Sequence, residues 1–312
     1  MLIRGVSRTL MAAVVAVPLL AAGVADGRAE EGAGLPWQLL HYNHAYGVLD
    51  HETADAVEHS AYLRRFADFE LRTTTGDEGQ TWTGSYLLGR ETYLELFKAG
   101  DLPGQDSRPG SGGLALSTEH ANELPEVTDE LRDEGVAAPI EFSQTRDFGD
   151  GRPVPWFDSV LTTQQYDTFG AWAMEYRPEY FADPRSETEP PSHPGDVGRE
   201  RYLPDDYRRH LMRDVTGVRI AVTAQDLANT VPLLRAGDFV VLRRHGGVVA
   251  HGKGTTLRFD VVPAHRTGLR QVEMSLNRAP GYRHEERLGR SVLVVGPAAR
   301  AVWTFGSPHG RP

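Results

Sequence analysis

A histidine and a glutamate in two strand-like runs near the N-terminus are the residues best placed to do chemistry. The runs are HYNHAYGVLD, which contains His44, and TYLELF, which contains Glu95. Side chains alternate between the two faces of a strand, so each polar residue shares its face with aromatic side chains. An imidazole or a carboxylate among aromatic rings needs a partner, and a divalent metal ion is a partner that uses both. The two runs therefore predict that His44 and Glu95 point into one cavity and bind a metal there.

The elements that must position these residues are repeated along the chain. HAYGVLDHETADAV, GLALSTEHANELPEV and GVRIAVTAQDLANTV each combine a short apolar strand, a polar turn and an amphipathic helix. Each segment is followed, about fifty to sixty residues after its first strand, by a strand with one glutamate: Glu95, Glu175 or Glu273. A repeat of this size indicates one structural unit used three times. The predicted βαβββ modules span roughly residues 38–103, 110–182 and 213–280.

The first module shows the expected element pattern most clearly. An apolar stripe predicts a helix at about residues 53–69, and three strands are expected at about 69–75, 80–88 and 91–98. Residues 183–198 are rich in proline and charge, which is typical of a linker. The expected domain organisation is therefore a pair of modules at 38–182, a linker at 183–212, and a third module with C-terminal strands at 213–306.

The N-terminus has the composition of an export signal. Residues 1–25 contain two arginines, an apolar run of 16 residues and no acidic residue. This pattern is typical of a secretory signal peptide, cleaved after Ala25 or alternatively after Ala29. The apolar run is short and is interrupted by Pro18, which argues against a stable membrane span. The mature protein is therefore expected to be secreted.

Charge and cysteine content exclude several classes of function. The net charge is −10, and removal of the first 25 residues makes it −12. An acidic protein without a basic block is a poor candidate for binding a phosphate backbone, so no nucleic-acid partner is expected. The chain has no cysteine, which excludes thiolate catalysis and cysteine-rich zinc sites.

The strand–helix–three-strand order resembles a module of the vicinal-oxygen-chelate superfamily, which includes glyoxalases, extradiol dioxygenases and bleomycin-resistance proteins. In NHAYGVLD, RTTT, WTGSYL and TYLELF the chain is most similar to a glyoxalase-like family of exported bacterial proteins. The resemblance covers residues 38–182 and, more loosely, the third module. It implies an α/β (α+β) fold in which two βαβββ modules form a cup. That family carries no particular reaction over to this chain.

The resemblance also implies a set of metal ligands. His44 matches the first-strand ligand, Glu95 the last-strand ligand of the first module, and Glu175 the last-strand ligand of the second. The fourth position falls within Gly112–Leu114, where no side chain can coordinate. One histidine and two glutamates would suit Zn, Mn, Fe(II) or Ni, and they would leave coordination sites open for a substrate. Alternatively, His44 is a satisfied core histidine and the glutamates are paired with cations.

Two further features bear on the predicted cup. Glu273 occupies the glutamate position of the third module, which lacks a first-strand ligand, so that module is expected to cap the cup or to mediate association, as in a homodimer. Aromatic side chains in the strands are candidates for an apolar pocket that holds a ring-containing molecule, although they also suit an ordinary core. The candidate pocket residues are Tyr42, Tyr46, Tyr86, Tyr93 and Trp172.

Three functions remain open from the sequence. The first is an exported metal-dependent enzyme of the lyase, isomerase or hydrolase type, with a small oxygen-rich or aromatic substrate and Glu175 as the catalytic base. The second is a non-catalytic protein that binds a small aromatic or antibiotic-like molecule outside the cell. The third is a structural or interaction module, which only the odd number of modules supports.

Overall fold

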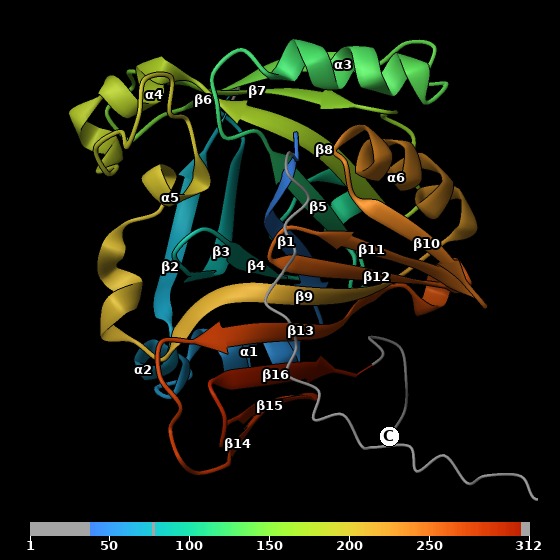
Figure 1. Cartoon of the computed structure of the whole chain (residues 1–312). Helices are drawn as coiled ribbons and strands as arrows, with labels where there is room; N and C mark the ends of the chain where they lie inside the picture. The colour runs from blue at the N-terminus through green and yellow to red at the C-terminus, as the bar shows by residue number, and fades with distance from the viewer. Residues whose placement is uncertain (1–37, 77–78, 307–312) are drawn as a thin grey trace, which may run out of the picture. The chain divides into compact units, whose positions relative to one another are not determined.

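The computed structural model describes residues 38–76 and 79–306, so the predicted signal peptide at residues 1–25 lies outside the described residues. The described chain forms two mixed β-sheets of eight strands each, curled like half-barrels, with few helices (Figure 1). The predicted α+β class with βαβββ modules is therefore confirmed. Within this part of the chain, no helix is both long and apolar enough to cross a membrane.

The first sheet contains the two modules predicted at residues 38–103 and 110–182. Its elements are β1 (His41–Leu49), α1 (His51–Glu58), α2 (Leu63–Phe66), β2 (Asp68–Thr75), β3 (Thr81–Leu88), β4 (Tyr93–Lys98), η2 (Gly104–Ser107), β5 (Gly112–Ser117), α3 (Leu124–Asp133), β6 (Ile140–Arg146), β7 (Val154–Leu161) and β8 (Phe169–Tyr176). The strand order is β2-β3-β4-β1-β5-β8-β7-β6. In each module the first strand pairs in parallel with the last, and β1 and β5 join the two modules in antiparallel. The first strands of both modules therefore lie at the centre of one continuous sheet.

The helix predicted at residues 53–69 is broken into two short helices. Asp50 caps α1, because its carboxylate accepts a hydrogen bond from the backbone N–H of Thr53. After α1 ends at Glu58, the hydroxyl of Ser60 accepts a hydrogen bond from the N–H of Leu63 and so starts α2. The apolar stripe that predicted one helix is real, but local capping divides it.

Only one half of the second sheet repeats the module pattern, in which the first strand pairs in parallel with the last. Its elements are β9 (Met212–Val222), α6 (Ala224–Ala236), β10 (Val240–Arg244), β11 (Gly247–Gly252), β12 (Thr255–Val261), η5 (Ala264–Arg266), β13 (Gly268–Leu276), β14 (His284–Leu288), β15 (Ser291–Val295) and β16 (Arg300–Phe305). The strand order is β10-β11-β12-β9-β13-β16-β15-β14. β9 to β12 form a third βαβββ module, because β12 pairs in parallel with β9, whereas β13 pairs in antiparallel with β16.

The position predicted for Glu273 was wrong. Glu273 lies on β13, not on the last strand of the third module, which is β12. Its carboxylate pairs with Arg258 of β12 at 3.2 Å. A central strand and a module-closing strand have the same apolar alternation, so the sequence pattern could not distinguish them.

A connecting segment between the two sheets packs against the first sheet. After α4 (Pro178–Ala182), it contains η3 (Pro184–Ser186), α5 (Arg199–Tyr202) and η4 (Asp205–Arg209). We call residues 183–211 the strap. Arg199 of the strap is buried and donates a hydrogen bond to the backbone carbonyl of Tyr42 at 2.6 Å. The ring of Tyr202 stacks on Tyr176 with centroids 4.1 Å apart. The strap, which coincides with the predicted linker, is therefore an ordered wall beside the first sheet.

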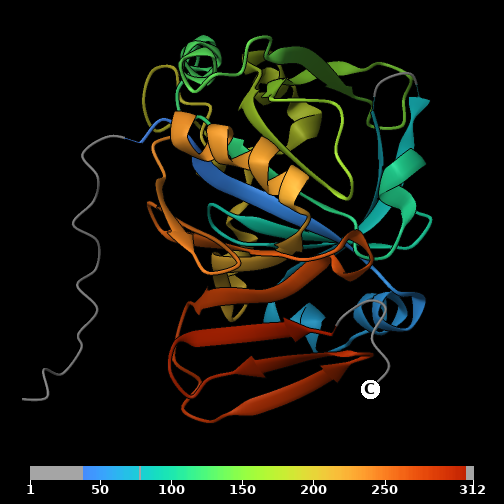
Figure 2. The ribbon, with the colours of Figure 1, turned by 90° about the vertical axis from the view of Figure 1, so that its right-hand side faces the viewer.

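Two aspartates, one on β9 and one on α6, hold loops of the first sheet. The carboxylate of Asp214 accepts hydrogen bonds from the backbone N–H groups of Glu91 and Thr92, next to β4. Asp226 is fully buried in α6 and accepts from the N–H groups of Asp167 and Thr168, next to β8. α6 also packs on β8 (Figure 2). The module built from β9 to β12 therefore supports both modules of the first sheet, next to the last strand of each.

Candidate functional site

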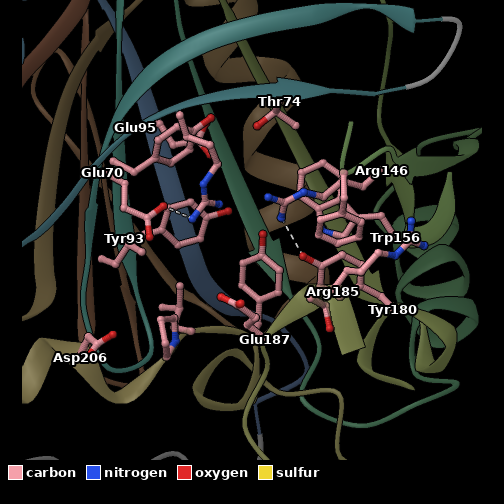
Figure 3. A pocket seen from close by; sticks show the side chains of 18 residues that line it. Glu70, Thr74, Tyr93, Glu95, Arg146, Trp156, Tyr180, Arg185, Glu187 and Asp206 are labelled. Atoms are coloured by element: carbon pink, nitrogen blue, oxygen red, sulfur yellow. Dashed lines mark hydrogen bonds and ion pairs between the residues drawn. The ribbon is translucent and has the colours of Figure 1, made fainter. Parts of the chain in front are cut away.

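A cavity of about 340 Å³ lies between the two halves of the first sheet (Figure 3). One wall comes from β2, β3 and β4 of the first module, and the other comes from β6, β7 and α4 of the second. The strap lines the rest. Aromatic rings make up much of the lining: Tyr86, Tyr93, Phe148, Trp156, Tyr180 and Tyr202.

The register of the strands aligns the polar residues of the first wall. Glu70 on β2 lies opposite Tyr86 on β3, and Tyr86 lies opposite Glu95 on β4. Residues two apart on one strand share a face, so Arg72 and Thr74 follow Glu70 into the cavity lining. A single cross-strand row therefore brings Glu95 to the cavity floor beside an arginine–glutamate pair.

The structure brings the side chains of His44 and Glu95 together. Nε2 of His44 lies 3.9 Å from Oε1 of Glu95, and the imidazole stacks on Tyr93 with centroids 4.4 Å apart. Trp172 meets the same imidazole edge-on at 5.6 Å. Glu95 reaches the cavity, whereas His44 lies behind Tyr93. Glu95 is thus the member of the pair that a ligand in the cavity can reach.

Burial keeps both members of this pair neutral. Desolvation raises the pKa of Glu95 from 4.5 to about 8, and the nearby Arg72 opposes this shift only in part. Desolvation also lowers the pKa of His44 to about 3. A carboxylic acid and a neutral imidazole are therefore the forms present at neutral pH, although the two groups have the separation of an ion pair.

A hydrogen bond fixes the tautomer of His44. The side-chain amide of Asn43 donates to the hydroxyl of Ser117, so its oxygen Oδ1 is free to accept from Nδ1 of His44 at 2.9 Å. The imidazole proton then lies on Nδ1, and Nε2 presents a lone pair toward Glu95. The carboxylic acid of Glu95 therefore faces the basic nitrogen Nε2 of His44, and a ligand in the cavity can reach Glu95.

The structure does not bring Glu175, the predicted ligand and base, to His44 and Glu95. Its carboxylate accepts hydrogen bonds from the backbone N–H groups of Asn122, Glu123 and Leu124 at 2.7, 2.9 and 2.9 Å. These groups lie at the start of α3, where an anion stabilises unpaired N–H groups. Glu175 also lines a different cavity. Trp172 faces His44, and Glu175 is an odd number of residues further along β8. Because side chains alternate along a strand, Glu175 lies on the opposite face of β8 from Trp172.

The second module supplies apolar groups where the resemblance implied ligands. On β5 the inward position is Gly113, opposite Tyr46 of β1. A Cβ atom there would lie 2.2 Å from the ring of Tyr46 and 2.9 Å from that of Trp172, so only glycine lets both rings lie over β5. The next inward position on β5 is Ala115. Aromatic packing therefore fills the half of the cup that would hold the other ligands.

This donor set does not fit the predicted metal centre. His44 and Glu95 are two donors, and Glu175 is bound to α3. Among residues 38–76 and 79–306, no group of three or more histidine, cysteine, aspartate or glutamate side chains has the geometry to hold a metal ion. A protein-bound catalytic metal generally has three protein ligands. We therefore derive no chemical step through a metal.

The predicted pocket residues have three different outcomes. Tyr86 and Tyr93 line the cavity, as predicted. Tyr46 and Trp172 pack beneath the cavity floor without lining it. Tyr42 was assigned to the wrong face, because an irregularity between Tyr42 and His44 breaks the alternation of β1 and buries Tyr42 in the main core.

Several cavity residues were not anticipated from the sequence. Arg146 on β6, Trp156 on β7 and Tyr180 on α4 form most of the second wall. Arg72 lies within the RTTT segment, and its even spacing from Glu70 was the available signal. The strap residues could not be found, because a proline-rich segment has no periodicity that indicates its direction.

Comparisons with known proteins agree with this architecture. A hypothetical protein from Staphylococcus aureus has 11% sequence identity and a TM-score of 0.50, with 81% of this chain and 98% of that chain covered. A variant of homoprotocatechuate 2,3-dioxygenase from B. fuscum has 11% identity and a TM-score of 0.38, with 74% and 56% covered. A xylose isomerase-like TIM barrel/4-hydroxyphenylpyruvate dioxygenase fusion protein has 13% identity and a TM-score of 0.38, with 72% and 33% covered. This chain thus spans just over half of the dioxygenase and a third of the fusion protein. At these identities the comparisons concern the fold alone.

The two-module sheet defines an α+β protein built from βαβββ modules, and the hypothetical protein from Staphylococcus aureus is similar to this chain in fold. A family model, the family of unknown function DUF5829, matches residues 42–305, and the chain belongs to that family. A search of curated proteins gives no match.

Proposed function

We propose that this protein binds a small aromatic molecule in the cavity of the first sheet. The observation that carries the proposal is the enclosure of about 340 Å³ by six ring side chains with a polar centre at its floor. Small-molecule sites are generally concave and apolar, with a few polar groups that fix the orientation of the ligand. Rings on opposite walls suit a planar ligand, because offset and edge-on contacts between rings are favourable.

The side chains available as metal ligands favour a binding function over metal-dependent catalysis. The metal-dependent lyase, isomerase or hydrolase predicted from the sequence would need a third protein ligand beside His44 and Glu95. Trp172 and Ala115 occupy the second-module side of the cup, and Glu175 is held by the backbone of α3. An aromatic ligand requires no such donor, and the lining already fits it.

The test is ligand binding by the purified mature protein. A panel of small neutral and charged aromatic molecules is screened by isothermal titration calorimetry and by the change in Tm. Trp156→Ala removes one ring from the cavity wall and should weaken binding of every positive compound about 10-fold or more. Phe142→Ala is the matched control, because Phe142 lies on the neighbouring strand β6, is 40% exposed and does not line this cavity. The absence of binding by all compounds, or equal loss in both variants, would refute the proposal.

Proton transfer is a second candidate function. His44 and Glu95 form an acid–base pair at 3.9 Å with pKa values displaced in opposite directions, a feature that is common at catalytic sites. The ionised fraction of Glu95 would take a C–H proton from a bound ligand and then return a solvent-derived proton to the same carbon. Between the two steps Glu95 itself holds the proton, because the low pKa of His44 keeps that imidazole neutral. An aromatic α-keto acid in D₂O tests this role, because catalysis should exchange its C–H proton faster with the wild type than with Glu95→Gln. Equal exchange rates would exclude it.

We also propose that the protein works outside the cytoplasm after cleavage near Ala25, and that this cavity meets its ligand there. N-terminal sequencing of secreted protein checks the cleavage. Retention of Met1 in exported material would contradict it.

A further inference from the structure

One arginine of the described cavity lining lacks the carboxylate partner that the other two have. Arg72 pairs with Glu70. Arg185 pairs with Asp183 at 2.6 Å and with Asp150 at 2.8 Å. Arg146 has no carboxylate within 4.0 Å among residues 38–76 and 79–306. One guanidinium of the lining is therefore left without a negative counterpart.

Contacts with aromatic rings hold this arginine in place. Its guanidinium lies over the rings of Phe148 and Trp156, at 4.9 and 5.4 Å from their centroids. Nη1 donates a hydrogen bond to the hydroxyl of Tyr180 at 2.7 Å. Figure 3 shows Arg146, Trp156 and Tyr180 grouped on one wall of the cavity, across from Glu95 and Tyr93. A planar cation stacked on rings has already lost much of its side-chain freedom, so it can bind an anion at a low entropic cost.

The acidic residues of the lining do not compensate this charge. Glu95 is kept neutral by burial, as described above. Asp206 pairs with Arg209 at 3.1 Å, and Glu187 is exposed. Glu70 is already engaged by Arg72. The charge of Glu187 is in contact with solvent, whereas Arg146 is half-buried, so Arg146 is the cation of the described lining that a bound anion can pair with.

A second polar group of the same wall lacks a partner. Nε1 of Trp156 is buried and has no hydrogen-bond acceptor in the described part of the chain. An indole N–H can only donate, so the group that satisfies it must be an acceptor. Because this nitrogen has almost no accessible surface, a ligand carboxylate would be placed by the guanidinium of Arg146 and not by the indole.

A cationic ligand is disfavoured by the same geometry. A ligand cation would bind the faces of aromatic rings. Arginines already cover the faces of several rings, with Arg72 5.1 Å from the centroid of Tyr86 and Arg146 over Phe148 and Trp156. A second positive charge beside these guanidinium groups would be repelled.

We propose that the ligand of this cavity is a small aromatic acid, and that its carboxylate pairs with Arg146. The proposal rests on the function proposed above, because it names the class of molecule that the same cavity binds. The ring of the ligand lies between the tyrosines of β3 and β4 and the wall of Trp156. Arg146 is then the residue that determines specificity for an anion.

The experiment compares two probes that differ in one charge. 4-Hydroxybenzoate and its uncharged counterpart 4-hydroxybenzamide are titrated at pH 7 into the wild type and into Arg146→Met by isothermal titration calorimetry. The wild type should bind the acid at least about 10-fold more tightly than the amide, and Arg146→Met should weaken the acid about 10- to 100-fold, as expected for a charge-assisted pair. The affinity for the amide should stay the same.

Two further variants separate recognition from folding. Arg152→Met is the control, because Arg152 lies in the loop between β6 and β7, pairs with Asp150 and does not line the cavity. It should leave both affinities unchanged. Arg146→Lys keeps the charge and should retain part of the preference for the acid, even where Arg146→Met loses stability.

The outcomes separate this inference from the proposed function. Equal affinities of acid and amide in the wild type, or equal loss of both in Arg146→Met, would overturn the assignment of an anionic ligand and leave an aromatic site in place. Binding of neither probe, while another neutral aromatic compound of the panel binds, overturns the assignment as well. Binding of no aromatic compound of any charge overturns the proposed function and this inference together.

Discussion

Replacing Glu95 by glutamine should make the protein more stable in alkaline solution. Glutamine has nearly the same volume and hydrogen-bonding shape as the neutral acid but does not ionise. Burial raises the pKa of Glu95 to about 8, whereas the unfolded chain has the ordinary value of 4.5. Between these two pH values the native protein holds a proton that the unfolded chain has lost, so stability falls as the pH rises.

The size of the effect follows from that interval. About 1.4 kcal/mol of stability is lost for each pH step of one, which gives about 5 kcal/mol between pH 4.5 and 8. This is an upper bound, because local relaxation and entry of water reduce the cost of the buried charge. At pH 5 the wild type and Glu95→Gln should have similar free energies of unfolding. By pH 8.5 the variant should be the more stable one by several kcal/mol.

Urea unfolding of both proteins at half-unit intervals from pH 5 to 8.5 measures this difference directly. Other titrating groups are common to the two proteins, so the difference isolates Glu95. Glu179→Gln is the control: Arg177 lowers the pKa of Glu179, so the charge of this residue does not change on unfolding above pH 5. Its difference from the wild type should be constant. A constant difference for Glu95→Gln as well would refute the argument that Glu95 is protonated in the native protein.

Three further predictions concern the support of the site. Glu175→Ala should destabilise the protein by about 2–3 kcal/mol in urea unfolding, because three backbone N–H groups at the start of α3 lose their acceptor. The affinity for aromatic ligands should stay within about twofold. A loss of binding without a loss of stability would restore the predicted role of Glu175 in the site. Gly113→Ala should cost about 1–3 kcal/mol, since its Cβ would meet the rings of Tyr46 and Trp172, and an unchanged Tm would contradict the packing described for β5. Burial lowers the pKa of His41 to about 3, so below pH 6.5 the unfolded chain takes up a proton at this residue before the native protein does, and stability falls with the pH. His41→Gln should make this fall in stability less steep. The same dependence of stability on pH below 6.5 in the variant and the wild type would show that His41 does not contribute.

The repeated modules and one half of the site could be predicted from the sequence because they depend on short-range alternation. His44 and Glu95 each have a clear position on a strand, and the parallel pairing of β1 with β4 follows from the module order. Alternation fails where a strand is irregular, as between Tyr42 and His44. Prediction of the site also fails where a residue is assigned by analogy to a repeat, as Glu175 was. The spacing between Trp172 and Glu175 already placed these two residues on opposite faces of β8.

The second wall of the cavity could not be predicted for a different reason. Arg146, Trp156 and Tyr180 come from three separate elements, and only the tertiary arrangement brings them together. Their unusual property is an unmatched charge, which depends on which carboxylates lie nearby and not on the local pattern. The strap contributes the remaining lining residues from a segment whose composition indicates a linker.

A crystal structure of the mature protein with bound 4-hydroxybenzoate tests the central claim most directly. The claim predicts density for the ring in the first sheet between Tyr93 and Trp156, with the carboxylate within hydrogen-bonding distance of Arg146. Density only on the outer face of the sheet, or an empty cavity at a concentration that saturates binding in solution, would contradict it.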